Sequence, residues 1–346
     1  MSEFDVTRRE RRKTLLIVEG HHEKYELLSV LSRCFPELGI QPEDIWIYGT
    51  NIYVLFGELV KAYGADWDEQ DVDLPFVISA AQTPGDHRYK RDYLNILLIF
   101  DYERQEPRFN ADVIRRMQMY FNDPADVGKM YLNYPMLESY LHFQSFPDPD
   151  FRELKVPAFM QRGGEYKEKV QCLPMARSMD FYTILPGRLE KALEIEDTAE
   201  CQKCAEVLLA CSNEAQLEEA VRKISSTGCG DKNNVSHYLT YLVSERSYVG
   251  EGMCYWEYMR KRFAEIIGYN ICKANRILGG DYNIADGDLR KTYEALSLID
   301  VLQKQNEASA DMQSGFIWVL NTCLFFVVDY RFSLIEPSKG FAQIQT

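Results

Sequence analysis

Two short motifs in this sequence place acidic side chains directly after runs of apolar residues. The segment TLLIVEG ends on Glu19 and Gly20, and the segment NILLIFDYE carries Asp101 and Glu103. A carboxylate at the end of a buried strand is costly unless it is solvated, paired with a cation or bound to a metal ion. Carboxylate oxygens are the ligands that Mg²⁺ and Mn²⁺ prefer. The motifs therefore indicate one divalent-metal site, provided that the two segments are neighbouring strands.

Each motif also has a simpler interpretation. Glu19 can cap a helix that begins near His22, where an anion gains about 0.3 to 1 kcal/mol from the helix dipole. Asp101 can lie in an ordinary turn. Because both coincidences would have to occur on neighbouring strands, the shared metal site is the better hypothesis, with Glu19, Asp101 and Glu103 as catalytic and metal-binding residues.

Further charged residues accompany these motifs. Glu23 lies one turn into the helix that is expected after Glu19 and Gly20, and it is a further candidate metal ligand. Glu138, in NYPMLESY, begins a helix that follows a later strand, and it is either an additional metal ligand or an exposed helical glutamate. The basic residues near the acids are ordinary surface charges or contacts to nucleic-acid phosphates. The candidates for such contacts are Lys24, Arg104 and Arg108.

The acids need a framework that brings strand ends together, and the first part of the chain predicts one. The expected strands are residues 15–18, 44–48, 75–80, 95–101 and 129–133, and amphipathic helical patterns at 23–35, 51–63 and 112–121 lie between them. This alternation predicts an α/β fold with a mostly parallel sheet covered by helices on both faces. Ligands of such sheets bind at the carboxyl ends of the strands, where the acids are expected.

The chain changes character near residue 150. We expect a basic leader over 1–13, an α/β catalytic domain over 14–150, and a mainly helical domain over 151–346 that recognises substrate or mediates assembly. The helical assignment comes from apolar residues at three- and four-residue spacing. The apolar run at 315–328 is shorter than the ~18 to 20 residues of a membrane span, so it is expected to be a core helix. The leader carries Arg8, Arg9, Arg11, Arg12 and Lys13.

The composition limits the class of protein. The 346 residues are 46% hydrophobic and 27% charged, which is typical of a soluble globular protein. The net charge of −14 argues against coating of nucleic acid by bulk charge, although a local basic groove is compatible with it. Nine cysteines without a framework spacing, and no cleavable apolar leader, favour a cytoplasmic protein. Cys201 and Cys204 form a CxxC within a helical pattern and are expected to be structural.

The two acidic motifs, in this order and on matching strands, resemble the Toprim domain over roughly residues 12–144. In Toprim proteins a strand ending in Glu-Gly precedes a strand ending in Asp-x-Asp, and the acids hold Mg²⁺ at a phosphodiester. The resemblance matches Glu19 to the family's glutamate and Asp101 to its first aspartate. Glu103 stands in place of the second aspartate, with Glu106 as a substitute. The EG-x-x-E form with Glu23 is most similar to OLD-type nucleases and related phage-defence effectors.

The resemblance implies a Mg²⁺- or Mn²⁺-dependent nuclease that hydrolyses the phosphodiesters of DNA or transfer RNA. The sequence has no Gly-x-x-x-x-Gly-Lys-Ser/Thr loop, so the resemblance further implies an effector that works with an ABC-type ATPase partner in an antiviral, abortive-infection defence system. We also expect a homo-oligomer without a membrane segment. Two alternatives remain: a non-catalytic regulatory or scaffold subunit of an ATPase complex, and a small-molecule phosphatase, since IFDYE also mimics the Asp-x-Asp of haloacid-dehalogenase-type enzymes.

Overall fold

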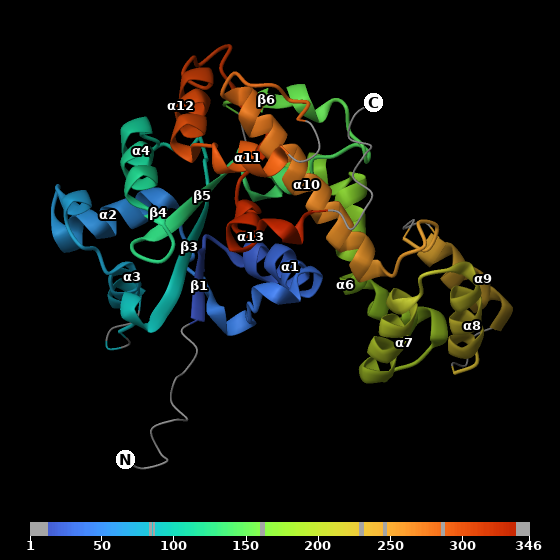
Figure 1. The fold of residues 1–346 in the computed structure, drawn as a ribbon. Coiled ribbons are helices and arrows are strands. Elements are labelled where there is room, and N and C mark those ends of the chain that lie inside the picture. Colours follow the sequence, from blue (N-terminus) through green and yellow to red (C-terminus); the bar gives the residue numbers. More distant parts are fainter. Residues whose placement is uncertain are drawn as a thin grey trace.

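A six-stranded, mostly parallel sheet forms the centre of the molecule in the computed structural model (Figure 1). The structure describes residues 13–82, 85, 87–159, 163–227, 232–244, 248–284 and 288–336. The strand order is β2-β1-β3-β5-β4, and β8 pairs with β5. Among the described strands of this sheet, β5 pairs antiparallel with β4 and β8, and the other pairings are parallel. The strands are β1 (Lys13–Val18), β2 (Ile45–Ile47), β3 (Tyr93–Asp101), β4 (Asn122–Asp123), β5 (Gly128–Tyr134) and β8 (Leu320–Asn321).

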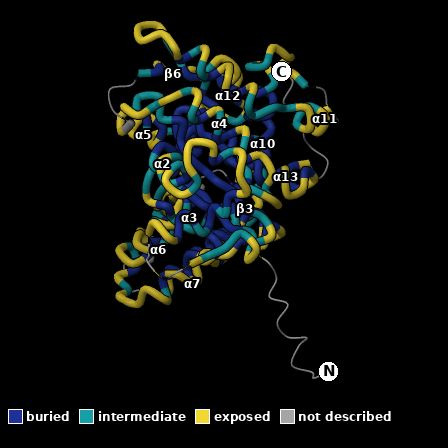
Figure 2. The backbone as a smooth tube through the Cα atoms, turned by 90° about the vertical axis from the view of Figure 1, so that its left-hand side faces the viewer, coloured by how far each residue is buried: buried dark blue, intermediate teal, exposed yellow. Residues whose placement is uncertain are grey.

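The central strands are those with uninterrupted apolar sequences. Leu16 in β1 and Leu98, Ile99 and Phe100 in β3 are fully buried. An uninterrupted apolar sequence is typical of a strand whose sheet is covered by helices on both faces. Figure 2 shows the buried chain running through the interior. The strands expected at 15–18, 44–48, 95–101 and 129–133 correspond to β1, β2, β3 and β5. The predicted α/β class with a mostly parallel sheet is therefore confirmed.

Helices lie on both sides of this sheet. Figure 1 shows α2, α3 and α4 on one side and α1 and α13 on the other. The helices of this part are η2 (Glu23–Leu28), α1 (Ser29–Cys34), α2 (Ile52–Tyr63), α3 (Leu74–Gln82), α4 (Ala111–Tyr120), α12 (Leu298–Ala308) and α13 (Phe325–Tyr330). Short 3₁₀ turns are η3 (Pro36–Leu38), η4 (Pro42–Asp44), η5 (Trp67–Glu69), η6 (Lys90–Asp92), η7 (Leu137–Leu141), η8 (Phe151–Glu153) and η9 (Phe332–Leu334).

The strand expected at 75–80 is wrong, because this segment is helix α3. The carboxylate of Asp73, just before the helix, accepts the backbone N–H of Phe76 at 3.2 Å, which is the arrangement of an N-terminal cap. Pro75 lies in the first turn, where its missing N–H costs nothing. An apolar run of six residues does not distinguish a strand from a buried helix, whereas the Asp-x-Pro start favours the helix.

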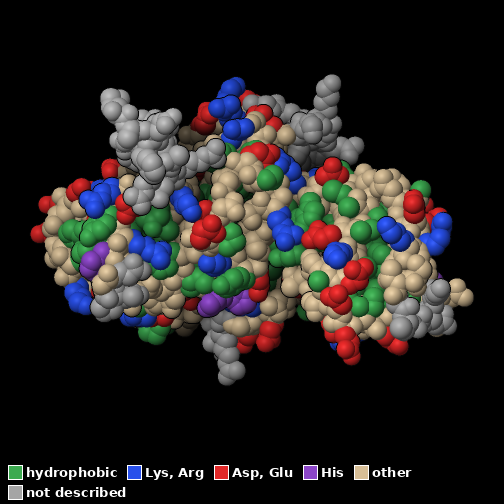
Figure 3. All heavy atoms as spheres, turned by 90° about the horizontal axis from the view of Figure 1, so that it is seen from below, with side chains coloured by type: hydrophobic (Ala, Val, Ile, Leu, Met, Phe, Trp, Pro, Cys, Tyr) green, Lys and Arg blue, Asp and Glu red, His purple; other side chains and the backbone are tan. Residues whose placement is uncertain are grey.

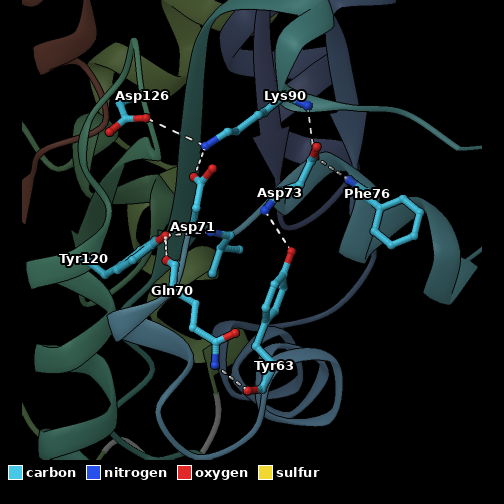
Figure 4. A network of polar contacts seen from close by, with 9 residues as sticks. Tyr63, Gln70, Asp71, Asp73, Phe76, Lys90, Tyr120 and Asp126 are labelled. Carbon is cyan, nitrogen blue, oxygen red and sulfur yellow. Dashed lines mark hydrogen bonds and ion pairs between the residues drawn. The ribbon is translucent and has the colours of Figure 1, made fainter.

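A polar network holds this helix to the amino end of the sheet (Figure 4). The N–H of Asp73 donates to the hydroxyl of Tyr63 at 3.0 Å, and its carboxylate also accepts the N–H of Lys90 at 2.9 Å. The Lys90 ammonium pairs with Asp71 and lies 3.8 Å from a carboxylate oxygen of Asp126. Lys90 lies just before β3, so the network is at the opposite edge of the sheet from Asp101.

Beyond residue 150 the chain is mainly helical, as expected. Figure 1 shows α7, α8 and α9 set apart from the sheet, with α6 and α10 leading to them. Cys201 and Cys204 are buried, free cysteines on α7, in agreement with a structural role. The helices are α5 (Gly163–Gln171), α6 (Pro174–Leu193), α7 (Thr198–Ala210), α8 (Glu214–Ser225), α9 (Lys232–Ser244), α10 (Tyr255–Ile277) and α11 (Leu289–Glu294).

The core helix expected at 315–328 is wrong for most of its length. Residues Phe316–Trp318 form β7, which pairs with β6 (Lys155–Pro157), and β8 follows before α13 begins at Phe325. Backbone pairing with β5 and β6 stabilises strands in this segment, although its apolar residues alone favour a helix. The sheet therefore includes chain from well beyond residue 150. The arginines of the expected basic leader lie outside the described residues.

Candidate functional site

Glu19 and Asp101 meet at the carboxyl end of the sheet. β1 and β3 are parallel neighbours, with Val18 opposite Ile99. Oε2 of Glu19 accepts the backbone N–H of Asp101 at 3.3 Å. The expected adjacency of the two strand ends is therefore confirmed, and the contact joins residues 82 positions apart in the sequence.

Asp101 lies at the centre of the acidic residues. Its side chain is only 9% exposed, and Nδ2 of Asn133, at the corresponding position of β5, donates to its Oδ1 at 3.4 Å. Burial raises the pKa of Asp101 well above the usual range, and nearby negative charges raise it further. These charges belong to Glu19, Glu23, Glu138 and Glu103, in decreasing order of effect. The structure thus brings these four predicted acids close enough to Asp101 for their charges to act on it.

Glu19 and Glu23 share the turn that follows β1. Burial, and then the charge of Glu103, raise the pKa of Glu19 to about 8. Glu23 is 4% exposed, and its Oε2 accepts the N–H of Gly20 at 3.0 Å. Burial also raises the pKa of Glu23, against the lowering effect of its hydrogen bonds. Without a cation, neutral pH therefore favours the protonated form of Glu19.

Glu103 lies beyond the end of β3. β3 ends at Asp101, and Glu103 has a φ of +40°, so the chain is no longer extended there. Positive φ is rare for a residue with a Cβ. Burial, followed by the charge of Glu106, raises the pKa of Glu103. Glu106 itself pairs with Arg108 at 2.7 Å, which makes it the poorer metal ligand of the two.

Glu138 is buried rather than exposed on its helical turn. It lies in η7, after β5, and is 4% exposed, so the interpretation as an exposed helical glutamate is wrong. Oε1 of Glu138 lies 2.8 Å from the ammonium of Lys167 on α5. Oε2 is buried and has no hydrogen-bond partner in the described part of the chain. Such an oxygen carries an uncompensated desolvation cost.

The candidate phosphate-binding residues differ in exposure and in the contacts that their side chains already make within the protein. The Lys24 ammonium donates to the carbonyl of Ile45 at 3.0 Å. Arg104 donates to the carbonyl of Ser309 at 3.2 Å, and its guanidinium stacks on two aromatic rings, those of Phe109 and Phe159. Arg108 is about half exposed, with a side-chain exposure of 55%. Of these candidates, Arg108 is the most accessible to a phosphate.

The donor set fits a hard divalent cation. Within the described ranges, no three or more His, Cys, Asp or Glu side chains already form a group that could hold a metal ion. Mg²⁺, however, needs only one or two protein carboxylates and takes its other ligands from water and substrate phosphate. Glu19 and Asp101, at adjacent strand ends, would supply these two oxygen ligands, and Oε2 of Glu138 is a further buried acceptor without a hydrogen-bond partner in the described residues.

Two residues of this site were not foreseen from the sequence. Asn133 lies opposite Asp101, one residue before the end of β5, so the rule that identified the acids at strand ends would also have identified it. Lys167 lies more than sixty residues after Asp101 in a helix whose sequence, GEYKEK, resembles any charged surface helix. No local pattern signals its position beside Glu138, because α5 is placed by tertiary packing.

Comparisons with protein-family models, with curated proteins and with solved structures find no match to this chain. In the described part of the chain, no helix has both the length and the apolar character needed to cross a bilayer. On the face drawn in Figure 3, the Lys and Arg side chains lie interspersed with Asp and Glu side chains.

Proposed function

We propose that this protein is a Mg²⁺- or Mn²⁺-dependent phosphodiesterase acting on nucleic acid, a nuclease of the Toprim type. The observation that supports this proposal best is the contact between the Glu19 carboxylate and the Asp101 backbone, at the carboxyl ends of two parallel strands and within a set of buried acids. Burial of several carboxylates together is unfavourable unless a cation compensates them. Metal binding is the role that explains this cost.

The chain's own residues can divide the work of hydrolysis. A bound divalent ion would supply Lewis-acid stabilisation of the phosphoryl oxygens and a more acidic water. Asp101 and Glu19, together with Glu103, would hold that ion. The pKa of Glu19, about 8 without a cation, would fall beside the bound ion, and its ionised carboxylate would then be able to take a proton from the attacking water near neutral pH.

The substrate class and partner follow from the same proposal. The net charge of −14 disfavours tight, sequence-independent binding along duplex DNA. A structured substrate such as transfer RNA, held near the acidic edge, fits better than long DNA. We further propose that the protein is the cytoplasmic effector of an antiviral, ATPase-coupled system, that a separate ABC-type ATPase controls it, and that it acts as a homo-oligomer.

A cleavage assay tests the activity. Supercoiled DNA, single-stranded DNA and total transfer RNA are incubated with Mn²⁺ or Mg²⁺ and with wild type, Glu19→Gln or Asp101→Asn. The proposal expects cleavage by the wild type and at least a 100-fold loss in both variants. Glu26→Gln is the matched control, because Glu26 is exposed on the same helical segment and pairs with His22. Equal cleavage by all variants would indicate a contaminating nuclease.

A second candidate function is a non-catalytic subunit of an ATPase complex. It is favoured by the helices α7, α8 and α9, which extend away from the sheet (Figure 1) and expose Val207 and Tyr241 to 45% and 56%. This candidate predicts that Glu19→Gln preserves biological activity. Loss of toxicity on expression of Glu19→Gln, with normal protein level, would reject it. Hydrolysis of small phosphate esters without nucleic-acid cleavage would instead favour a phosphatase.

A further inference from the structure

Lys167 brings a positive charge into the acidic site from the helical part of the chain. Its ammonium lies 2.8 Å from Oε1 of Glu138, and the two side chains are 35% and 6% exposed. Among the acids around Asp101, this is the one ion pair formed between described residues. Lys167 also acts electrostatically on Asp101 and on Glu23. Its ammonium therefore already serves as a cation for part of the cluster.

The position of Lys167 is fixed by its neighbour in the sequence. Tyr166 is 2% exposed, and its hydroxyl lies 3.1 Å from Nδ1 of His142, directly after η7. The two rings also pack edge to face, with centroids 5.4 Å apart. This buried contact joins α5 to the segment that carries Glu138. The Lys167–Glu138 ion pair is therefore part of a packed contact. It differs from an ion pair between flexible, exposed side chains, which changes its geometry readily.

The two carboxylate oxygens of Glu138 have different surroundings. Oε1 faces the Lys167 ammonium, whereas Oε2 is buried without a partner. A divalent ion at this oxygen would lie close to the ammonium, and two cations at such a distance in a poorly hydrated site repel each other strongly. Glu19 and Asp101 form no ion pair among the described residues, and the charge of Lys167 acts on Asp101 less than on Glu138 and is the smallest of the effects on Glu19.

Resting on the proposed metal-dependent function, we propose that the Lys167 ammonium fills the cation position at Glu138, so that the site binds one divalent ion, held by Glu19 and Asp101. Removing the ammonium leaves Glu138 as a free buried ligand. The cluster then has enough carboxylate oxygens for a second ion. Lys167 therefore determines how many metal ions the acidic site binds.

Metal stoichiometry tests the proposal directly. Binding of Mn²⁺ to the full-length protein is followed by the electron paramagnetic resonance signal of free Mn²⁺ at pH 8. The wild type is expected to bind one ion and Lys167→Met two, while Lys167→Arg, which keeps the charge, remains at one. Lys169→Met is the matched control, because Lys169 is an exposed lysine on the same helix. The double variant Lys167→Met/Glu138→Gln should return to one ion.

The outcomes separate this inference from the function on which it rests. Two ions in the wild type, or one ion in a folded Lys167→Met variant, would overturn the role of Lys167 and leave the metal-dependent function intact. Absence of Mn²⁺ binding by the wild type, equal to that of Asp101→Asn, would overturn both. Circular dichroism confirms folding, and if Lys167→Met is unfolded, Lys167→Gln provides the same neutral side chain in a more polar form.

Discussion

Burial raises the pKa of Glu19 from 4.5 to about 8, with a further contribution from the charge of Glu103. Between these two values the folded protein holds a proton that the unfolded chain has released. The free energy of unfolding therefore falls as the pH rises from about 4.5 to about 8. Glu19→Gln has no ionisable group at this position, so it lacks this part of the fall.

We expect Glu19→Gln to gain stability relative to the wild type by roughly 1 to 3 kcal/mol on going from pH 6 to pH 9 in the presence of a chelator. Urea unfolding at the two pH values measures the difference. Glu26→Gln, at an exposed position, should show a difference that does not change with pH. A pH-independent effect of Glu19→Gln would contradict the raised pKa.

Metal binding should release protons for the same reason. Glu19, Glu23, Glu103 and Asp101 all have raised pKa values, and a divalent ion binds only their ionised forms. We expect the affinity for Mg²⁺ to increase at least ten-fold between pH 6 and pH 8. Calorimetric titrations in two buffers with different ionisation enthalpies measure the protons released. An affinity that is constant over this range would show that the ion binds elsewhere.

At the level of secondary-structure elements, the amino end of the sheet depends on Asp73 more than on the ion pairs of Lys90. Asp73 accepts the backbone N–H groups of Phe76 and Lys90, whereas Lys90 pairs with Asp71 and Asp126, whose side chains are 79% and 70% exposed. A lost helix cap typically costs about 1 kcal/mol, and an exposed ion pair between 0 and ~1 kcal/mol.

We therefore expect Asp73→Ala to destabilise the protein by about 1 to 3 kcal/mol, and Lys90→Met by less than ~1 kcal/mol. Chemical denaturation of both variants gives the comparison. Since this network lies at the edge opposite Glu19, neither change should alter the affinity for Mn²⁺. If Lys90→Met destabilises the protein more than Asp73→Ala does, then the ion pairs of Lys90, and not the helix cap at Asp73, hold α3 to the amino end of the sheet.

The elements that could be predicted from the sequence are those whose pattern of apolar and polar residues fits only one kind of secondary structure. The continuous apolar runs of β1 and β3 end in acids, and only a buried parallel strand combines these features. The run at 75–80 was misread because its length fits both a strand and a helix, and the cap at Asp73 decides for the helix. The run at 315–328 was misread because its strands exist only through pairing with distant β5 and β6.

The site shows the same division between local and long-range information. Glu19 and Asp101 could be identified because the topology of a parallel sheet brings adjacent strand ends together. The burial of Glu138, its pairing with Lys167 and the positive φ of Glu103 depend on how η7, α5 and the chain after β3 pack. No spacing in the sequence encodes these contacts.

For the whole molecule, one asparagine joins the C-terminal part of the chain to the acidic site. Asn321 in β8 is fully buried, and its N–H donates to Oδ1 of Asn270 on α10 at 2.7 Å. Its side-chain amide donates to the carbonyl of Leu137 at 3.0 Å and lies 3.1 Å from the hydroxyl of Ser139. Leu137 and Ser139 flank Glu138, so Asn321 fixes the turn that presents this acid.

Asn321→Ala would leave several of these buried groups unsatisfied, and each costs about 1 to 3 kcal/mol. We expect a loss of about 2 to 4 kcal/mol in the free energy of unfolding, measured in urea, while the folded variant keeps its affinity for one Mn²⁺, because Lys167, and not the ion, pairs with Glu138. Asn122→Ala is the control, because Asn122 is exposed and its side chain donates to the nearby carbonyl of Met119 at 2.7 Å. Weaker Mn²⁺ binding by the folded Asn321→Ala variant would place Glu138 among the ligands of the ion and would contradict the role proposed for Lys167, since Asn321 acts on the site through the turn that carries Glu138.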